Sequence, residues 1–322
     1  EKLSTSSKSL HIRFRTGIYA SADHSLPMEE RFSYARFACN TLRGNFLRSI
    51  AYYDVSLRER SIFVEHVVND IHEGLEQKQF LVYYQPKYLI SGEEPKICSA
   101  EALVRWQHPK YGMIRPKSFL SVLEENGLIG LLDRYVIRET IEQLGRWRRD
   151  TGADFPVSVN VSRIDLYDMR FSDFLMGLLD ENGLKPKDLY LEITESAYSS
   201  DTRQLIEAVE GLRQDGFRIE MDDFGSGYSS LNSLSSMPVD VLKLDMNFIR
   251  TIHEDTKVRR MVRLIMELAE FMEIPVVAEG VEIAGQYDVL REIGCEYIQG
   301  NFFSKPLPAI DFEKYFLQEA EG

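Results

Sequence analysis

Cysteine is scarce in this chain of 322 residues, which contains only 3. Cys39, Cys98 and Cys295 are odd in number and far apart, without the close Cys/His spacing of a zinc site or the pattern of a disulfide framework. Such sparse cysteine is typical of proteins in a reducing compartment. We therefore expect a cytoplasmic domain.

Long apolar runs are also missing. No stretch approaches the roughly 18 apolar residues that a membrane-spanning helix needs, and residues 1–10 lack the apolar core of a signal peptide. We expect no membrane contact within this stretch of chain. Because it starts at Glu1 rather than at Met, the sequence also predicts a fragment, with any membrane anchor or sensor lying upstream.

Basic residues are outnumbered, since 38 Lys and Arg stand against 51 Asp and Glu, giving a formal net charge of −13. Binding of duplex nucleic acid depends on a Lys/Arg surface that neutralises phosphates, so this balance argues against that class of partner. A small anionic ligand is not excluded, because clustered carboxylates recruit divalent cations that reverse the local charge.

The pattern beyond about residue 80 alternates short apolar runs with amphipathic stretches of helical period. This alternation is typical of βα units. Residues 59–322 match in length the roughly 250 residues typical of a TIM barrel, and the predicted fold class is α/β, a modified TIM (β/α)8 barrel. The eight predicted strands cover residues 80–84, 97–106, 156–161, 189–194, 218–222, 239–244, 274–279 and 296–299.

Residues 1–58 have a different pattern. Strand-like runs at 11–20 and 49–53 flank a predicted helix over 28–43. So short a segment cannot bury much core alone, so we expect a small α+β extension in front of the barrel. A predicted helix over 58–77 connects the two parts, and the domain boundary is placed between residues 58 and 59.

Polar side chains follow the ends of the predicted strands, where a barrel carries its active site. A single Asp or Glu there is more often a helix cap or a solvated charge. Several anions at one barrel mouth repel one another unless cations such as Mg²⁺ or Mn²⁺ separate them. These residues are Glu101, Asn160, Glu192, Glu195, Asp222, Asp223, Lys243, Glu279 and Gln299.

The neighbouring pair Asp222 and Asp223 is suited to holding two ions, because one carboxylate can bridge while the other binds the second ion. Sites with two metals roughly 3.5–4 Å apart are a common way to hydrolyse phosphodiesters. The residues alone therefore predict metal-assisted phosphoryl chemistry.

Two alternatives fit parts of the pattern. Gly225 and Gly227 after a predicted strand resemble a dinucleotide-binding loop, but Ser230 stands in place of its third glycine and carboxylates precede it. Lys243 at a barrel strand end could instead form a Schiff base, which requires a lowered lysine pKa. Neighbouring carboxylates would keep Lys243 protonated.

At these residues the chain resembles the EAL-domain family of cyclic-di-GMP phosphodiesterases, named for the tripeptide Glu101-Ala102-Leu103. The resemblance covers about residues 59–322 and implies hydrolysis of cyclic-di-GMP to linear 5′-pGpG. Its other motifs begin at Tyr84-Gln85-Pro86, Val159-Asn160, Glu192-Ile193-Thr194-Glu195, Asp222-Asp223-Phe224-Gly225, Lys243-Leu244-Asp245, Ala278-Glu279-Gly280 and Gln299-Gly300.

The resemblance also implies residue roles. It implies two ions, Mg²⁺ or Mn²⁺, per site, held by Glu101, Asn160, Glu192, Asp222 and Asp223. It makes Lys243, Glu279 and Gln299 the residues that position and activate water, Glu195 the anchor of the loop 222–230, and Gln85, Leu103 and Arg105 the substrate contacts. In this family the loop takes part in dimer contact, so a homodimer through the barrel is expected.

Residues 11–58 resemble, more weakly, the last part of a GGDEF domain, through Arg15–Tyr19 and Ala35–Ala38. The Gly-Gly-Asp-Glu-Phe signature is absent, so synthesis of cyclic-di-GMP is not expected. Within the barrel, Glu220 and Asn301 depart from the family pattern, and an inward carboxylate at Glu220 could alter metal affinity. The alternative function is a cyclic-di-GMP receptor that signals without turnover.

Overall fold

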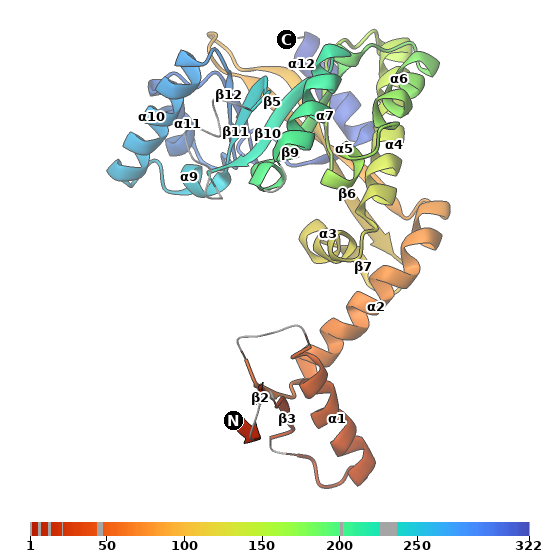
Figure 1. Ribbon diagram of the computed structural model, residues 1–322. Coiled ribbons are helices and arrows are strands. Elements are labelled where there is room, and N and C mark those ends of the chain that lie inside the picture. The colour runs from red at the N-terminus through yellow and green to blue at the C-terminus, as the bar shows by residue number, and fades with distance from the viewer. Residues whose placement is uncertain are drawn as a thin grey trace. The chain divides into compact units, whose positions relative to one another are not determined.

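The computed structural model describes residues 2–5, 8–11, 14–20, 22–43, 48–199, 202–225 and 237–321 (Figure 1). The chain divides into two compact units, residues 1–71 and 72–322. The dividing point lies inside helix α2 (Val55–Glu76), whereas the sequence analysis places the boundary near the start of this helix. None of the described helices combines the length and the apolar character needed to cross a membrane.

The first unit contains the elements predicted from its sequence. Helix α1 connects two parallel strands, β3 and β4, and an antiparallel hairpin of β1 and β2 precedes them. The rings of Tyr34 and Tyr53 stack with their centroids 4.5 Å apart. The bounds are β1 (Lys2–Thr5), β2 (Lys8–His11), β3 (Thr16–Ile18), α1 (Met28–Asn40) and β4 (Ile50–Tyr52).

The second unit is a closed barrel of eight strands, as the sequence predicts. The strands follow one another around the barrel in the order β5, β13, β12, β11, β10, β9, β8 and β6, and pairing of β6 with β5 closes it. Their bounds are β5 (Phe80–Leu89), β6 (Lys96–His108), β8 (Val157–Asn160), β9 (Leu189–Thr194), β10 (Arg218–Phe224), β11 (Val241–Leu244), β12 (Val276–Glu279) and β13 (Tyr297–Gln299).

The first barrel strand departs from the predicted βα repeat. β5 is antiparallel to both neighbours, β6 and β13, and no helix lies between β5 and β6. β5 also continues to Leu89, beyond the predicted end at Tyr84. Its register places Gln85 opposite Glu101, so Glu101 lies inside β6 rather than at its end. Two short strands extend the sheet, β7 (Gly112–Ile114) on β6 and β14 (Leu307–Pro308) on β5.

Helices pack their apolar faces on the outward side chains of the strands in one continuous core. For example, Tyr84 of β5 meets Trp147 of α4 at 4.8 Å between ring centroids, and Trp147 meets Phe312 of α12 at 5.2 Å. The helices are α3 (Pro116–Glu125), α4 (Ile129–Thr151), α5 (Arg163–Leu166), α6 (Phe171–Glu181), η1 (Pro186–Asp188), η2 (Glu195–Ser199), α7 (Thr202–Gln214), α9 (Met246–Arg250), α10 (Thr256–Phe271), α11 (Ala284–Glu292) and α12 (Ala309–Glu321).

Successive side chains of a strand point to opposite faces, and this alternation separates the apolar core from a polar barrel interior. In β9, Leu191 and Ile193 are fully buried in the core, while Glu192 between them makes ion pairs inside the barrel. In β11, Leu242 and Leu244 likewise belong to the core. The inward residues therefore supply a chain of charged groups along the barrel axis.

Candidate active site

Lys243 is the centre of the polar cluster. Its Nζ lies 2.6 Å from Glu279 Oε1, 2.7 Å from Glu192 Oε2, 3.0 Å from Asp222 Oδ1 and 3.6 Å from Glu101 Oε2. These carboxylates come from four different strands, β12, β9, β10 and β6. The structure thus brings together the side chains that the sequence analysis placed at one rim of the barrel.

The pKa values of this cluster follow from burial and mutual charge. Burial by itself would lower the pKa of Lys243, but the carboxylates led by Asp222 and Glu101 outweigh burial and hold that pKa well above its usual range. Burial would raise the pKa of Glu192, but Lys243 and Lys87 outweigh it and hold that pKa below its usual range. Lys243 therefore stays protonated, which disfavours the Schiff-base alternative.

Two side-chain amides fix the carboxylate of Glu101. Gln299 Nε2 donates to Glu101 Oε2 at 2.5 Å, and Asn160 Nδ2 donates to Glu101 Oε1 at 3.3 Å. Burial, followed by the charge of Glu192, raises the pKa of Glu101 to about 7. A carboxylate oriented in this way presents its oxygens toward the barrel mouth at a fixed place.

Asp222, Asp223 and Glu279 form a second close group, with one carboxylate oxygen of each within 4.8 Å of the others. The β10–β11 register shifts between Met221 and Phe224, and Asp223 adopts the left-handed region with φ of +56°. This irregularity allows two consecutive aspartates to approach one site, although strand alternation would point them apart. Burial and the charge of Asp222 raise the pKa of Asp223 to about 6.

The oxygens of this cluster fit a divalent cation. Asp222 Oδ1 and Glu279 Oε1 contact Lys243 as ion pairs, but among the described residues neither has a hydrogen bond of good geometry, and the buried Gln299 Oε1 also has none. Buried acceptors without donors are costly. Carboxylate and amide oxygens are the ligands that Mg²⁺ and Mn²⁺ prefer.

Glu195 begins the short helix η2 directly after β9 and contacts the chain at the end of β10. Its Oε2 accepts a hydrogen bond from Gly225 N at 2.7 Å. Gly225 has φ of +88°, and a Cβ there would lie 2.3 Å from the ring of Phe248, so only glycine fits. Residues 226–236, including Gly227, Ser230 and most of the loop expected to join a dimer, lie outside the described residues.

The expected substrate contacts lie on the hairpin of β5 and β6. Gln85 donates to Ser304 O at 3.2 Å and accepts from Gln299 Nε2 at 3.2 Å, so it borders the cluster. Leu103 and Arg105 lie further along β6. The guanidinium of Arg105 stacks over Tyr83 at 5.5 Å and forms no ion pair within the described part of the chain. Its position four residues beyond Glu101, about 13 Å along an extended strand, places it away from the carboxylates.

Lys87 is a buried cation of the barrel interior that the sequence analysis missed. Its Nζ lies 2.5 Å from Glu220 Oε2, 2.8 Å from Glu192 Oε1 and 2.7 Å from Ser158 Oγ. It escaped notice because β5 was predicted to end at Tyr84. Period-two alternation from Gln85 would have placed Lys87 on the inward face.

The structure also shows what surrounds Glu220, one of the two residues that depart from the family pattern. Its carboxylate faces inward, as expected. It forms an ion pair with Lys87, and its Oε2 accepts a hydrogen bond from Ser158 Oγ at 2.7 Å. Lys87 binds Glu192 through Oε1 and Lys243 binds it through Oε2, so a chain of contacts connects Glu220 through Lys87 and Glu192 to Lys243. Asn301, the other departure, is exposed in a turn.

Fold and site together define an α/β barrel with a carboxylate-rich mouth whose oxygens could hold a metal ion. A closed barrel excludes the dinucleotide-binding alternative, because that kind of site requires an open, doubly wound sheet. The EAL domain model matches residues 68–306, and the chain belongs to the EAL domain family.

Two relatives of this chain carry names that include cyclic di-GMP phosphodiesterase. The chain is 34% identical over 300 residues to the cyclic di-GMP phosphodiesterase PdeR of Escherichia coli, covering 93% of this chain and 45% of that protein. It is 35% identical over 243 residues to the bifunctional diguanylate cyclase/cyclic di-GMP phosphodiesterase MucR of Pseudomonas aeruginosa, covering 76% of this chain and 35% of MucR. The chain thus spans less than half the length of these relatives.

Solved structures share the fold. A complex of the PaMucR phosphodiesterase with c-di-GMP superimposes with a TM-score of 0.71 at 34% identity, covering 77% of this chain and 99% of that chain. The EAL enzyme Bd1971 in its cAMP- and cyclic-di-GMP-bound form gives 0.74 at 28% identity, covering 92% and 77%.

Proposed function

We propose that this protein hydrolyses one 3′–5′ phosphodiester bond of cyclic-di-GMP and releases linear 5′-pGpG. The observation that carries the proposal is the convergence of four carboxylates on Lys243 at the barrel mouth, in a family whose named relatives include cyclic-di-GMP phosphodiesterases. A carboxylate mouth of this kind suits metal-assisted phosphoryl transfer.

The proposed cofactors are two Mg²⁺ or Mn²⁺ ions. When bound, such ions neutralise the developing charge on the phosphoryl oxygens and lower the pKa of water. The donor chemistry described above supports this assignment. The proposed ligands are Glu101, Asn160, Glu192, Asp222 and Asp223.

Lys243 and Glu279 have separate proposed roles. The Lys243 ammonium stays protonated, so it orients the attacking water by donating to it and cannot remove its proton. Burial, followed by the opposing charge of Lys243 and repulsion from Asp222, leaves the pKa of Glu279 well above its usual range. Glu279 Oε1 lies 2.6 Å from Lys243 Nζ, so a water held by Lys243 would lie within its reach, and Glu279 is the proposed base. Gln299 holds Glu101 in place and Glu195 holds the start of the loop after β10.

The substrate is proposed to lie across the hairpin rim. Arg105, half-buried and free of an ion pair in the described part of the chain, suits one phosphate of cyclic-di-GMP. Gln85 and Leu103 complete the contact surface. This placement leaves the second phosphate at the carboxylate cluster, where cleavage occurs.

The remaining expectations concern the whole protein. We propose that residues 1–58 are the end of a GGDEF-type domain, supported by the β3–α1–β4 arrangement. We also propose a homodimer formed through the barrel and a cytoplasmic location. Sedimentation that shows a fully active monomer at assay concentration would contradict the dimer.

Turnover with different cations tests the function. Incubation with cyclic-di-GMP and Mg²⁺ or Mn²⁺ should release pGpG, detected by chromatography, while Ca²⁺ should support substrate binding with little or no cleavage. Mg²⁺ keeps octahedral geometry at about 2.0–2.1 Å, whereas Ca²⁺ accepts 6–8 ligands at about 2.3–2.6 Å and misplaces the reacting groups. Binding without pGpG in any ion would identify a receptor, and full turnover after exhaustive chelation would refute the metal site.

A further inference from the structure

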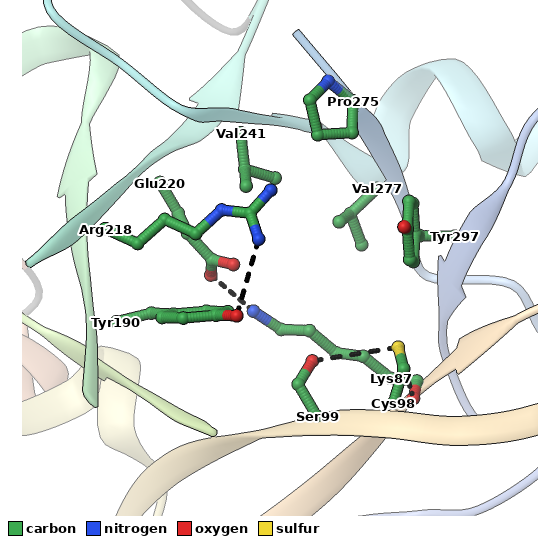
Figure 2. Close-up of a pocket in the computed structure, with 10 residues that line it drawn as sticks. All are labelled: Lys87, Cys98, Ser99, Tyr190, Arg218, Glu220, Val241, Pro275, Val277 and Tyr297. Atoms are coloured by element: carbon green, nitrogen blue, oxygen red, sulfur yellow. Dashed lines mark hydrogen bonds and ion pairs between the residues drawn. The ribbon is translucent and has the colours of Figure 1, made fainter. Parts of the chain in front are cut away.

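A cavity of about 150 Å³ is lined mostly by residues at the starts of the barrel strands, whereas the carboxylate mouth lies at the strand ends. Figure 2 shows the residues that line this cavity. Its wall is formed by the first inward residues of several strands, among them Tyr190 of β9, Arg218 of β10, Val241 of β11 and Tyr297 of β13. A cavity of roughly this volume accommodates a ligand the size of benzene. The proposed chemistry at the mouth uses none of these four side chains.

The charges that line the cavity do not balance. Two cations, Lys87 and Arg218, face one carboxylate, Glu220. Lys87 is already paired with Glu220, and it also binds Glu192 beyond the lining. Arg218 has no carboxylate within 4.0 Å in the described part of the chain. The surplus charge of the cavity is therefore the guanidinium of Arg218.

The guanidinium is held in place by an aromatic ring. It lies 5.3 Å from the ring centroid of Tyr190, and Nη1 donates to Tyr190 Oη at 3.4 Å. Arg218 is half-buried and lines the cavity, and Figure 2 shows its side chain extending among the other lining residues. Stacking of this kind leaves the remaining N–H groups of the planar fork available for a bidentate acceptor.

Part of the cavity wall is apolar. Val241 lies next to the guanidinium, and Pro275 and Val277 continue the apolar part of the wall (Figure 2). A ligand that matches both the guanidinium and the apolar wall carries an anionic oxygen pair at one end and a short aliphatic body at the other. A free inorganic oxyanion satisfies the guanidinium but leaves the apolar wall without contact.

We propose that this cavity binds a small organic carboxylate of about six non-hydrogen atoms, with its carboxylate on Arg218 and its aliphatic part against Val241, Pro275 and Val277. The site is separate from the phosphodiesterase mouth. A ligand bound there contacts Lys87, the residue that connects the cavity to Glu192.

Calorimetric titration of the whole chain tests the site with isobutyrate, its neutral isostere isobutyramide, and inorganic phosphate. We expect isobutyrate to bind with a dissociation constant below about 5 mM and isobutyramide at least tenfold more weakly, because only the carboxylate pairs with the guanidinium. No binding of isobutyrate at 20 mM, or equal binding of the amide, would overturn the proposal. Tighter binding of phosphate than of isobutyrate would also overturn it, in favour of an inorganic anion.

A pair of arginine variants locates the binding. Arg218→Met should weaken isobutyrate at least tenfold, whereas Arg203→Met, which removes a side chain 93% exposed to solvent, should change it less than twofold. Unchanged binding in Arg218→Met would overturn the assignment. If that variant does not fold, the comparison of acid and amide on the wild-type protein still decides the outcome.

Discussion

The ion pair of Lys87 and Glu220 provides the sharpest test of the barrel interior. Their side chains are only 1% and 3% exposed, with Lys87 Nζ 2.5 Å from Glu220 Oε2. Removing one partner of a buried pair costs about 3–5 kcal/mol, because the other charge stays buried without a counter-charge. We expect Lys87→Met to lower the free energy of unfolding by that amount, and Tm by about 6–20 °C at about 2–4 °C per kcal/mol.

Replacing Glu220 instead of Lys87 should lower the free energy of unfolding by less. After Glu220→Gln, the ammonium of Lys87 still has Glu192 Oε1 at 2.8 Å and Ser158 Oγ at 2.7 Å. The loss is then about 1.5–3 kcal/mol, the contribution of one charged hydrogen bond. In the double variant no unpaired charge remains at this position, since Glu192 keeps Lys243 at 2.7 Å. We expect the double variant to be more stable than Lys87→Met alone, with a coupling energy of about 2 kcal/mol or more.

Urea unfolding followed by tryptophan fluorescence measures the cycle. The chain has 2 tryptophans, Trp106 and Trp147, and both are buried in the barrel unit, so the signal reports that unit. Lys314→Met is the control, because its side chain is 67% exposed and surface changes usually stay within about 0.5 kcal/mol. Additive losses in the double variant, or a loss below about 1 kcal/mol for Lys87→Met, would refute this account.

Three further predictions concern single residues. Glu101→Ala should abolish pGpG formation while circular dichroism shows a retained fold, and wild-type turnover in a folded variant would contradict its role as a ligand. Lys243→Arg keeps the charge but loses the compact ammonium, so kcat should fall about 100-fold; a borohydride-trapped adduct at Lys243 would instead revive the Schiff-base alternative. Burial and the neighbouring Asp165 raise the pKa of Asp133 well above its usual range, so this carboxyl destabilises the fold as pH rises above about 4. Asp133→Asn should therefore raise the Tm of the barrel more at pH 7 than near pH 4, and thermal unfolding at both pH values checks this.

Much of the fold could be predicted because the relevant signal is local. Period-two alternation in stretches such as 189–194 and 218–222 marks both the strand and its inward face. Carboxylates that end parallel strands must meet at one barrel mouth, so the convergence of Glu192, Asp222 and Glu279 follows once the strands are identified.

The antiparallel direction of β5 could not be predicted from such local patterns. A strand has the same periodicity whether it runs parallel or antiparallel to its neighbours, and a short connection over residues 90–95 joins β5 to β6 without a crossover helix. The antiparallel register is what brings Gln85 opposite Glu101, and Gln85 in turn contacts Gln299. Pairing between strands is decided by the whole sheet, which local patterning does not encode.

The sequence by itself thus determined where the eight barrel strands lie, apart from the continuation of β5 to Leu89, and that the barrel mouth is acidic. Only the tertiary structure decided which inward groups meet. Lys87 and Glu220 are separated by 133 positions in the sequence. The cavity around Arg218 is formed by residues at the starts of several strands. Such contacts depend on barrel closure and register, because the free energy of a buried charge is set by neighbours in space rather than in sequence.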